Sequence, residues 1–283
     1  MENIFSTSSS LHLVKHLKGY THSHLQKYQN GEITIATCVK TKKGYVISSI
    51  HNSDTLVELI LLLDAIRDVS VTLILTYVFY SRQDKAMKNT SFGAKVIHNL
   101  LERPNVEEII HLDSHSSFFT VKNREVSAFE LFQKDLKRFQ NENLLIVAPD
   151  IGIREKAMHL AKNLNLPFLQ GHKTRINGRI AFFDVRGSEI YPEGFKCVLV
   201  DDMVDSGDTF RVASNWLFAH GAIDVRCYCT HCLSGKNIEA IANETKISEF
   251  VISDSICQKL PIRKTRCISI LPILKKIIYD VDM

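Results

Sequence analysis

The stretch Lys196–Phe210, KCVLVDDMVDSGDTF, gives the clearest indication of how this chain folds. Its apolar run Cys197–Val200 is typical of a strand that is buried on both faces. Asp201 and Asp202 follow where that strand should end, and a helical pattern covers Arg211–His220 after the small-residue turn. A strand, a turn and a helix start bring several backbone N–H groups to one point, at the positive end of the helix dipole. The stretch therefore predicts an anion-binding site.

The side chains of this turn indicate which anion it binds. Ser206 and Thr209 offer hydroxyl donors, and Gly207 lets the backbone approach a ligand closely. Asp201 and Asp202 would repel a phosphate, but they can accept hydrogen bonds from vicinal hydroxyls or hold a cation. A phosphate site beside a diol site fits a pentose phosphate. An ordinary capped helix without a ligand is the alternative interpretation.

Composition restricts the class of protein. The chain has 283 residues, 45% hydrophobic and 23% charged, which is typical of a soluble globular protein with room for two domains. The formal net charge of +4 is small and its basic residues are dispersed, so we expect no nucleic-acid partner. The longest apolar run, near Leu59–Leu63, is too short to span a membrane, and the first residues do not resemble a secretory signal. We therefore expect a cytoplasmic protein without a membrane partner.

The cysteines raise the question of a metal site. Seven cysteines at irregular spacing argue against a disulfide framework and favour a reducing compartment. Cys227, Cys229, His231 and Cys232 form a cluster, but their spacing is not the paired CxxC of structural zinc sites. Cys227 and Cys229 alternate with Tyr228 along a predicted strand, so we expect both to pack as small apolar side chains.

Alternating strands and helices predict the fold class. The predicted strands are Val71–Phe79, Glu108–Leu112, Leu144–Ala148, Pro167–Leu169, Ala222–Cys229 and Phe250–Ser253. The predicted helices are Thr55–Asp68 (capped by Asp54), Phe92–Glu102, Arg154–Leu164, Lys236–Asn243 and Ile273–Tyr279. This order predicts an α/β fold of two similar doubly wound domains with mostly parallel sheets, residues 1–140 and 141–283. The boundary is expected near Gln140–Asn143, and Leu25–Ala36 is expected to form two strands joined by a turn at Tyr28–Glu32.

Three polar clusters follow predicted strands directly. They are Tyr80–Asp84, Asp113–His115 and Pro149–Gly152. Ligands of open α/β sheets bind at the carboxyl ends of strands, which is where these clusters fall. A single Asp or His at a strand end is commonly a helix cap or a surface residue. Three clusters together with the anion-binding turn favour a binding site.

With these motifs, the chain resembles the ribose-phosphate diphosphokinase family (5-phosphoribosyl diphosphate synthetases), which has the type I phosphoribosyltransferase fold. Val198–Thr209 is similar to the loop of that fold that binds 5-phosphoribosyl diphosphate. The other family motifs are matched by Arg82-Gln83-Asp84, by Tyr28, Asn30, Gly31 and Glu32, by Asp113 and His115, by Pro149, Asp150 and Gly152, and by Lys173 and Arg175.

The resemblance implies transfer of the β,γ-diphosphoryl group of ATP to the 1-hydroxyl of ribose 5-phosphate, with Mg²⁺ as cofactor. It implies ATP binding by Tyr28, Asn30, Glu32, Arg82, Gln83, Asp84 and His115. It implies ribose 5-phosphate binding by Asp201, Asp202, Asp205, Ser206, Gly207, Asp208 and Thr209. His115 and Asp150 would hold Mg²⁺, and Lys173 and Arg175 would act in catalysis from a mobile loop, Gln170–Arg179. It also implies a homo-oligomer whose active sites lie at subunit interfaces.

The chain departs from the family pattern at four places. Asp208 replaces the second glycine of the phosphate turn, and we expect its side chain to point away from the phosphate. The stretch after His115 is shortened, Thr37–Lys43 replaces an arginine-containing segment, and Ile176–Gly194 differs from the usual sequence. Phosphate activation and inhibition by nucleoside diphosphates are therefore not implied.

Other functions stay open on the sequence. A larger acceptor that ends in ribose 5-phosphate, such as ADP-ribose, fits if the phosphate pocket is open. A non-catalytic regulatory homologue would be expected to lose the Lys-x-Arg or a metal ligand, and this chain keeps both. A phosphoribosyltransferase would need neither the Arg-Gln-Asp motif nor a second domain.

Overall fold

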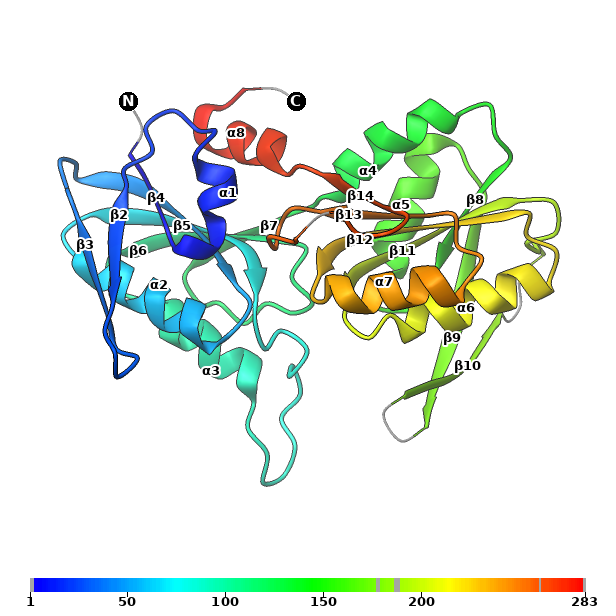
Figure 1. The fold of residues 1–283 in the computed structure, drawn as a ribbon, viewed down its shortest axis with the longest axis horizontal. Coiled ribbons are helices and arrows are strands. Elements are labelled where there is room, and N and C mark those ends of the chain that lie inside the picture. Colours follow the sequence, from blue (N-terminus) through cyan, green and yellow to red (C-terminus); the bar gives the residue numbers. More distant parts are fainter. Residues whose placement is uncertain (1–2, 177–178, 186–188, 260, 282–283) are drawn as a thin grey trace. The chain divides into compact units, whose positions relative to one another are not determined.

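The computed structural model describes residues 3–176, 179–185, 189–259 and 261–281, and Figure 1 shows its elements in chain order. The chain divides into two compact units. Unit 1 comprises Met1–Ser127, Ser255–Cys257 and Ile270–Met283, and unit 2 comprises Ala128–Asp254 and Gln258–Ser269. Each unit is an α/β domain built on a mostly parallel sheet, as the alternation predicts.

The limits of the units differ from the predicted 1–140 and 141–283. Helix α4 (Phe129–Leu136) belongs to unit 2, where the Phe132 ring meets the Tyr228 ring edge to face at 5.4 Å. Helix α8 (Leu271–Tyr279) returns to unit 1, where the Tyr279 hydroxyl donates to the Lys18 carbonyl at 2.5 Å. A sequence pattern predicts a helix but does not specify which sheet it packs on. Because unit 2 already begins at Ala128, the predicted boundary near Gln140–Asn143 lies inside unit 2.

Unit 1 contains a five-stranded sheet in the order β1-β4-β5-β6-β7, and all its neighbouring strands are parallel. The strands are β1 (Ile4–Ser6), β4 (Lys43–Ile50), β5 (Ser70–Val78), β6 (Val106–Leu112) and β7 (Lys122–Val126). Helices α2 (Ser53–Ala65) and α3 (Gly93–Leu101) lie on one side of it, and α1 (Leu11–Val14) and α8 on the other (Figure 1). A short 3₁₀ turn, Ser8–Ser10, precedes α1.

The cap of α2 is Asn52 and not the predicted Asp54. The Asn52 side chain accepts the Thr55 N–H at 2.9 Å, and the Thr55 hydroxyl accepts the Asn52 N–H at 3.2 Å. These two bonds form a capping box. Because the helix begins two residues earlier than predicted, Asp54 lies in its first turn. There a carboxylate still interacts favourably with the helix dipole.

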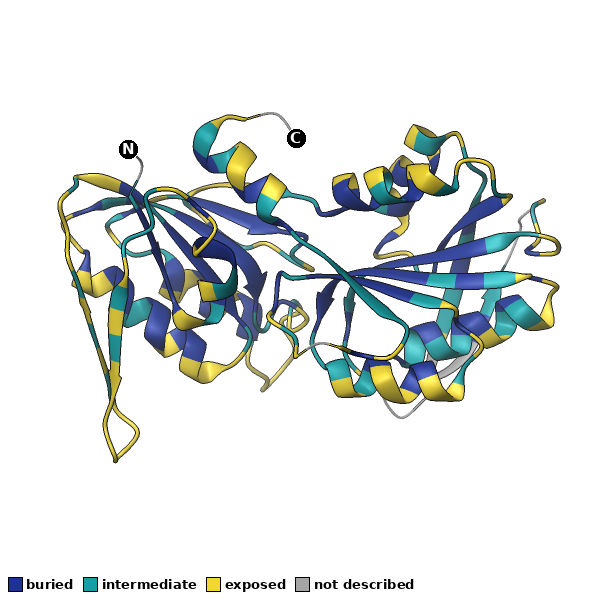
Figure 2. Cartoon of the chain, turned by 45° about the horizontal axis from the view of Figure 1, so that its top comes forward, coloured by how far each residue is buried: buried dark blue, intermediate teal, exposed yellow. Residues whose placement is uncertain are grey.

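A separate hairpin extends from unit 1. Strands β2 (Ser23–Lys27) and β3 (Ile33–Thr37) are antiparallel, which confirms the predicted pair of strands. At the tip the Tyr28 N–H donates to the Glu32 carbonyl at 2.8 Å, and Gly31 has a φ of 91°, which favours glycine. The tip is exposed, as its yellow colour in Figure 2 shows.

Unit 2 contains a seven-stranded sheet in the order β10-β9-β8-β11-β12-β13-β14, parallel except for the pair β9–β10. The strands are β8 (Leu144–Ala148), β9 (Phe168–Ile176), β10 (Arg179–Val185), β11 (Lys196–Val204), β12 (Asp224–Cys232), β13 (Glu249–Ser253) and β14 (Thr265–Ile268). Helices α4 and α5 (Arg154–Leu164) lie on one side, and α6 (Asp208–Ala219) and α7 (Gly235–Glu244) on the other (Figure 1). A 3₁₀ turn, Lys137–Phe139, follows α4.

The segment Gln170–Arg179, predicted as a mobile loop, is mostly strand. Residues of β9 pair antiparallel with β10, so that Lys173 lies opposite Phe183. Pairing satisfies the backbone groups of both segments, which a basic composition alone does not indicate. A β-carbon at Gly171 would overlap the Phe183 ring, so glycine allows the two strands to pack closely here.

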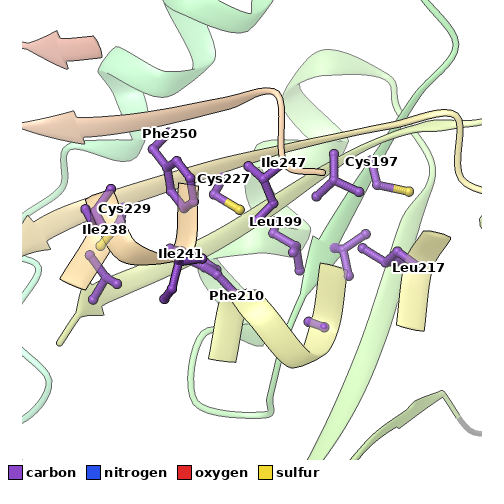
Figure 3. Packing of buried hydrophobic residues seen from close by; sticks show 14 of the residues in the cluster. Cys197, Leu199, Phe210, Leu217, Cys227, Cys229, Ile238, Ile241, Ile247 and Phe250 are labelled. Atoms are coloured by element: carbon purple, nitrogen blue, oxygen red, sulfur yellow. The ribbon is translucent and has the colours of Figure 1, made fainter. Parts of the chain in front are cut away.

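The core of unit 2 contains the cysteines that the sequence grouped together. Cys227 and Cys229 are buried with Leu199, Phe250 and Ile241 between the sheet and its helices (Figure 3). Burial raises the pKa of both thiols well above the ordinary value, so they stay protonated and unreactive. The packing role predicted for them is confirmed.

Among the described residues, no helix is both long enough and apolar enough to cross a bilayer. Nor do any three of their histidine, cysteine, aspartate or glutamate side chains form a cluster suited to a metal ion.

Candidate functional site

Charged side chains from three neighbouring strands meet in unit 2. Strand β8 lies between β9 and β11 and is parallel to both, so Asp150 follows β8 at the edge where β11 carries Asp201 and Asp202. Lys173 in β9 forms an ion pair with Asp150. The parallel arrangement therefore brings together a predicted metal ligand, a predicted catalytic lysine and the predicted diol carboxylates.

Asp201 is the buried member of this group, with 7% of its surface exposed. Burial raises the pKa of its carboxyl well above the ordinary value, and the charges of Asp202 and Asp150 raise it further, whereas Lys173 lowers it. Its Oδ1 accepts the Asp202 N–H at 3.0 Å. Asp201 is thus a carboxyl group whose charge depends on the cations placed beside it.

Asp150 uses both of its oxygens. Oδ1 accepts the Gly152 N–H at 2.8 Å, and Oδ2 pairs with the Lys173 ammonium. That Asp150 also binds a metal ion stays a prediction. The Arg175 backbone belongs to β9, but its side chain lies outside the described part of the structure.

The predicted phosphate turn lies between β11 and α6. Gly207 caps α6 with a φ of 77°, and a β-carbon there would overlap the Ile241 side chain of α7. From the same helix, the Asn237 amide donates to the Asp205 carbonyl at 2.8 Å. Helix α7 therefore supports the turn from which α6 begins, and the first N–H groups of a helix have no partner within that helix.

Asp208 makes local contacts that the sequence did not predict. Its Oδ1 accepts from the Arg211 guanidinium at 2.8 Å, one helical turn further on, and its Oδ2 accepts from the Ser206 hydroxyl at 3.2 Å. The charge that departs from the family pattern is thus paired within the helix. That the side chain points away from a bound phosphate stays a prediction.

In unit 1, the segment Tyr80–Asp84 follows β5 in a tight turn. Tyr80 has a φ of 66°, and its carbonyl accepts the Gln83 N–H at 2.8 Å. The Gln83 carbonyl in turn accepts the Ala94 N–H at 3.1 Å at the start of α3. A β-carbon at Gly93 would overlap the side chains of Gln83 and Tyr80, so glycine is needed where this helix begins.

The segment Asp113–His115 follows β6 and places its two motif residues differently. Asp113 is fully buried and its Oδ1 accepts the Ser127 hydroxyl at 2.7 Å, whereas His115 is exposed. Asp113 therefore anchors the segment, and His115 is the residue that can reach a ligand. The Ser116 hydroxyl donates to the Ser81 carbonyl at 2.7 Å, which ties this segment to the Tyr80–Asp84 turn.

The remaining predicted nucleotide residues lie on the hairpin tip. Tyr28 is 47% exposed, and the Asn30 Oδ1 accepts the Glu32 N–H at 3.1 Å. The predicted sites thus fall into two sets, nucleotide residues in unit 1 and ribose phosphate residues in unit 2. Sequence reasoning missed Ser81, Ser116 and Arg211; only Arg211 had a usable signal, its spacing of three residues from Asp208.

The Mg²⁺ that the resemblance implies stays a prediction. His115 in unit 1 and Asp150 in unit 2 are the residues expected to offer one ligand each, and the described residues include no three-ligand cluster. Mg²⁺ keeps several waters and commonly takes only one or two protein ligands, with substrate phosphates completing its shell.

Two α/β domains on mostly parallel sheets, with a strand–turn–helix segment that carries paired carboxylates in unit 2, are typical of the phosphoribosyltransferase fold. Family comparison agrees. The N-terminal domain of ribose phosphate pyrophosphokinase matches residues 3–104, and the phosphoribosyl transferase domain matches residues 121–261. The chain belongs to the ribose-phosphate pyrophosphokinase family.

Individual relatives extend over most of the chain. It is 30% identical over 270 residues to a ribose-phosphate pyrophosphokinase of Maricaulis maris, covering 90% of this chain and 86% of the relative. It is 35% identical over 254 residues to that of Bradyrhizobium diazoefficiens, covering 85% and 79%. Among solved structures, phosphoribosylpyrophosphate synthetase from Mycobacterium smegmatis superposes with a TM-score of 0.83 at 25% identity, covering 98% of this chain and 97% of that one.

Proposed function

We propose that this chain is a ribose-phosphate diphosphokinase, which transfers the β,γ-diphosphoryl group of ATP to ribose 5-phosphate. The O1 hydroxyl of the sugar attacks the β-phosphorus, the bond from that phosphorus to the α,β-bridging oxygen breaks, and the hydroxyl proton is released. The products are 5-phosphoribosyl 1-diphosphate and AMP. The observation that carries the proposal is the charged group Asp150, Lys173, Asp201 and Asp202 beside the fixed anion-binding turn.

The residues of unit 2 would hold the acceptor. The N–H groups at the start of α6, with the hydroxyls of Ser206 and Thr209, bind the 5-phosphate, assisted by the helix dipole. Asp201 and Asp202 accept hydrogen bonds from the ring hydroxyls. The turn keeps its shape because Gly207 and Asp205 are held against α7.

The residues of unit 1 would hold ATP. The Tyr80–Asp84 turn presents Arg82, Gln83 and Asp84, and the exposed His115 lies on the segment that Ser116 ties to that turn. Phosphoryl transfer depends mainly on positioning and charge stabilisation, so a rigid connection between these two segments favours it.

Lys173 would stabilise the transferred group. Its ammonium forms an ion pair with Asp150, and only 16% of the side chain is exposed, which supports a role within the site rather than in free solvent. His115 and Asp150 would each offer a ligand to Mg²⁺, which would neutralise phosphate charge when bound. Arg175 would assist from the same strand.

The proposal includes a homo-oligomer with shared active sites. Tyr28 is exposed at the tip of a hairpin, as a residue that stacks on the adenine of a partner's ATP would be. Val96 and Leu100 are 53% and 43% exposed one helical turn apart on α3, an apolar pair that a second subunit would cover. Glu32 would then accept a hydrogen bond from the adenine amine.

A cytoplasmic location is also proposed. Among the described residues all seven cysteines carry free thiols, which suits a reducing compartment.

The experiment that tests the reaction is product identification by mass. Purified protein is incubated with ATP and Mg²⁺, and with ribose 5-phosphate, ADP-ribose or no acceptor. We expect AMP and 5-phosphoribosyl 1-diphosphate with ribose 5-phosphate, and no AMP without an acceptor. If AMP is released with ADP-ribose but not with ribose 5-phosphate, the acceptor in the proposal must be changed to ADP-ribose. Release of ADP, or no reaction with either acceptor, would contradict the proposal.

A further inference from the structure

A buried histidine in unit 1 has no place in the motifs considered so far. His98 lies in α3 with 0% of its surface exposed. Its Nδ1 accepts the backbone N–H of Phe118 at 2.9 Å, and its ring stacks on the Phe119 ring with centroids 4.0 Å apart and planes 13° apart. Both phenylalanines follow His115 in the segment after β6, so His98 holds the far end of the segment that carries the proposed metal ligand.

The bond requires a neutral imidazole with its proton on Nε2. Burial and the neighbouring His111 lower the pKa of His98 to about 4, against a smaller opposing effect of Glu102. The lone pair of Nδ1 is therefore available to the Phe118 N–H near neutral pH. Nε2 has no hydrogen-bond partner among the described residues, so the Phe118 bond is the contact that accounts for a nitrogen at this position.

Helix α3 holds both proposed ATP-binding segments of unit 1. At its start, the Ala94 N–H donates to the Gln83 carbonyl. The Phe92 ring meets the Phe118 ring edge to face at 4.8 Å, and His98 completes the attachment of that second segment. One rigid element thus sets the spacing between the Arg82–Asp84 turn and the segment of His115.

The short connection makes this attachment effective. Only Ser116 and Ser117 separate His115 from Phe118, and the Ser116 hydroxyl is bonded to the Ser81 carbonyl. A shift of Phe118 must therefore move His115, because so few residues cannot absorb it.

We propose that His98 is a positioning residue for magnesium–ATP: by holding Phe118 and Phe119 against α3, it fixes His115 relative to the Arg82–Asp84 turn. The inference rests on the proposed function, since it assigns His115 and that turn to ATP. It predicts a selective effect on ATP, because the hydrogen bond and ring contacts described for His98 lie in unit 1, whereas the residues proposed to hold ribose 5-phosphate belong to unit 2.

A matched pair of variants separates the hydrogen bond from the packing. His98→Phe keeps an aromatic ring on Phe119 but removes the acceptor, whereas His98→Asn offers an amide oxygen near the place of Nδ1. Asn99→Ala, at an exposed position of the same helix, is the control. Ser116→Ala removes the second attachment without altering the core, and it serves if His98→Phe does not fold.

Two measurements are made on each variant. Amide hydrogen exchange of residues 114–119, followed without ligand, reports the attachment itself. Isothermal titration with ATP and Mg²⁺, and KM for each substrate, report its consequence. A buried N–H left without an acceptor changes an equilibrium about tenfold or more. We expect His98→Phe to speed exchange and to weaken ATP binding by about tenfold, with KM for ribose 5-phosphate changed less than twofold. His98→Asn should restore both, and Ser116→Ala should show a smaller change of the same kind.

Three results would overturn the inference. One is faster exchange with unchanged ATP binding. Another is an equal effect on both substrates together with a lowered Tm, which would make His98 merely structural. The third is failure of His98→Asn to differ from His98→Phe. If the wild-type chain binds ATP in a His98-dependent way but forms no product, the proposed reaction fails and the positioning role stands. If it binds no ATP, both fail.

Discussion

The Asp208–Arg211 pair at the start of α6 leads to a prediction with opposite signs for its two members. Asp208 accepts from Arg211 at 2.8 Å and from Ser206 at 3.2 Å, inside the turn proposed to bind the 5-phosphate. Arg211→Gln leaves the Asp208 carboxylate without its cation, so ribose 5-phosphate should bind more weakly. Asp208→Gly frees Arg211 to interact with the phosphate, so binding should strengthen.

The magnitude follows from charge and exposure. Two unit charges about 4 Å apart repel by about 1 kcal/mol in water, and a phosphate monoester carries about −1.5 to −2. The Asp208 side chain is 24% exposed, so solvent screening applies. Arg211→Gln should therefore raise KM for ribose 5-phosphate by about tenfold. Asp208→Gly should lower KM by about twofold to fivefold, the range of an exposed ion pair, and the double variant should lie within about threefold of the wild type.

The assay is the steady-state KM for ribose 5-phosphate at saturating ATP, in low and in high salt. The Arg211→Gln effect should shrink at high salt because the repulsion is screened, and KM for ATP should stay unchanged. Arg263→Gln, at an exposed arginine of the same unit, is the control. The reasoning is refuted if Arg211→Gln leaves KM for ribose 5-phosphate unchanged, or if Asp208→Gly raises it.

Four further outcomes are expected. Lys173→Ala should lower turnover by about two to three orders of magnitude, the effect of one lost transition-state contact, and should leave ATP affinity unchanged; a tenth of the activity remaining would contradict its role. Asp201→Asn and Asp202→Asn should raise KM for ribose 5-phosphate far more than KM for ATP, because an amide has fewer acceptor lone pairs; equal effects would indicate that they hold the metal. Inactive Tyr28→Ala chains mixed with inactive Lys173→Ala chains should recover activity if sites are shared, whereas re-equilibrated mixtures that stay inactive exclude sharing. The free energy of unfolding should fall as the pH drops from 6.5 towards about 4, by about 2 kcal/mol at pH 5, because His98 binds a proton in the unfolded chain but stays neutral in the folded one. In His98→Asn the melting temperature should depend less on pH over this range.

Local patterns in the sequence predicted the elements around unit 2's anion-binding turn. The apolar run before Asp201 and the helical pattern after Arg211 correspond to β11 and α6. Burial on both faces of a parallel strand and the periodicity of a helix are properties of neighbouring residues, so they can be read without knowing the fold. The predicted pair of strands around Tyr28–Glu32 was confirmed for the same reason.

Errors arose where local signals compete or where the partner is distant in sequence. Asn52 and Asp54 are both good caps, and only the position of the first helical turn decides between them. Gln170–Arg179 is basic and contains glycine, but pairing with β10 makes most of it strand. Helix α8 belongs to unit 1 although β14 directly before it belongs to unit 2, and no local pattern indicates this change.

The sequence by itself determined the order of strands and helices, the turn between β11 and α6, and the residue types of the candidate site. These follow from side-chain chemistry and spacing over a few residues. Only the tertiary structure decided that Lys173 pairs with Asp150 and that His98 holds Phe118. The physical reason is that a parallel sheet places strands side by side that are separated along the chain, and a helix packed on it contacts whichever segment the sheet order brings there.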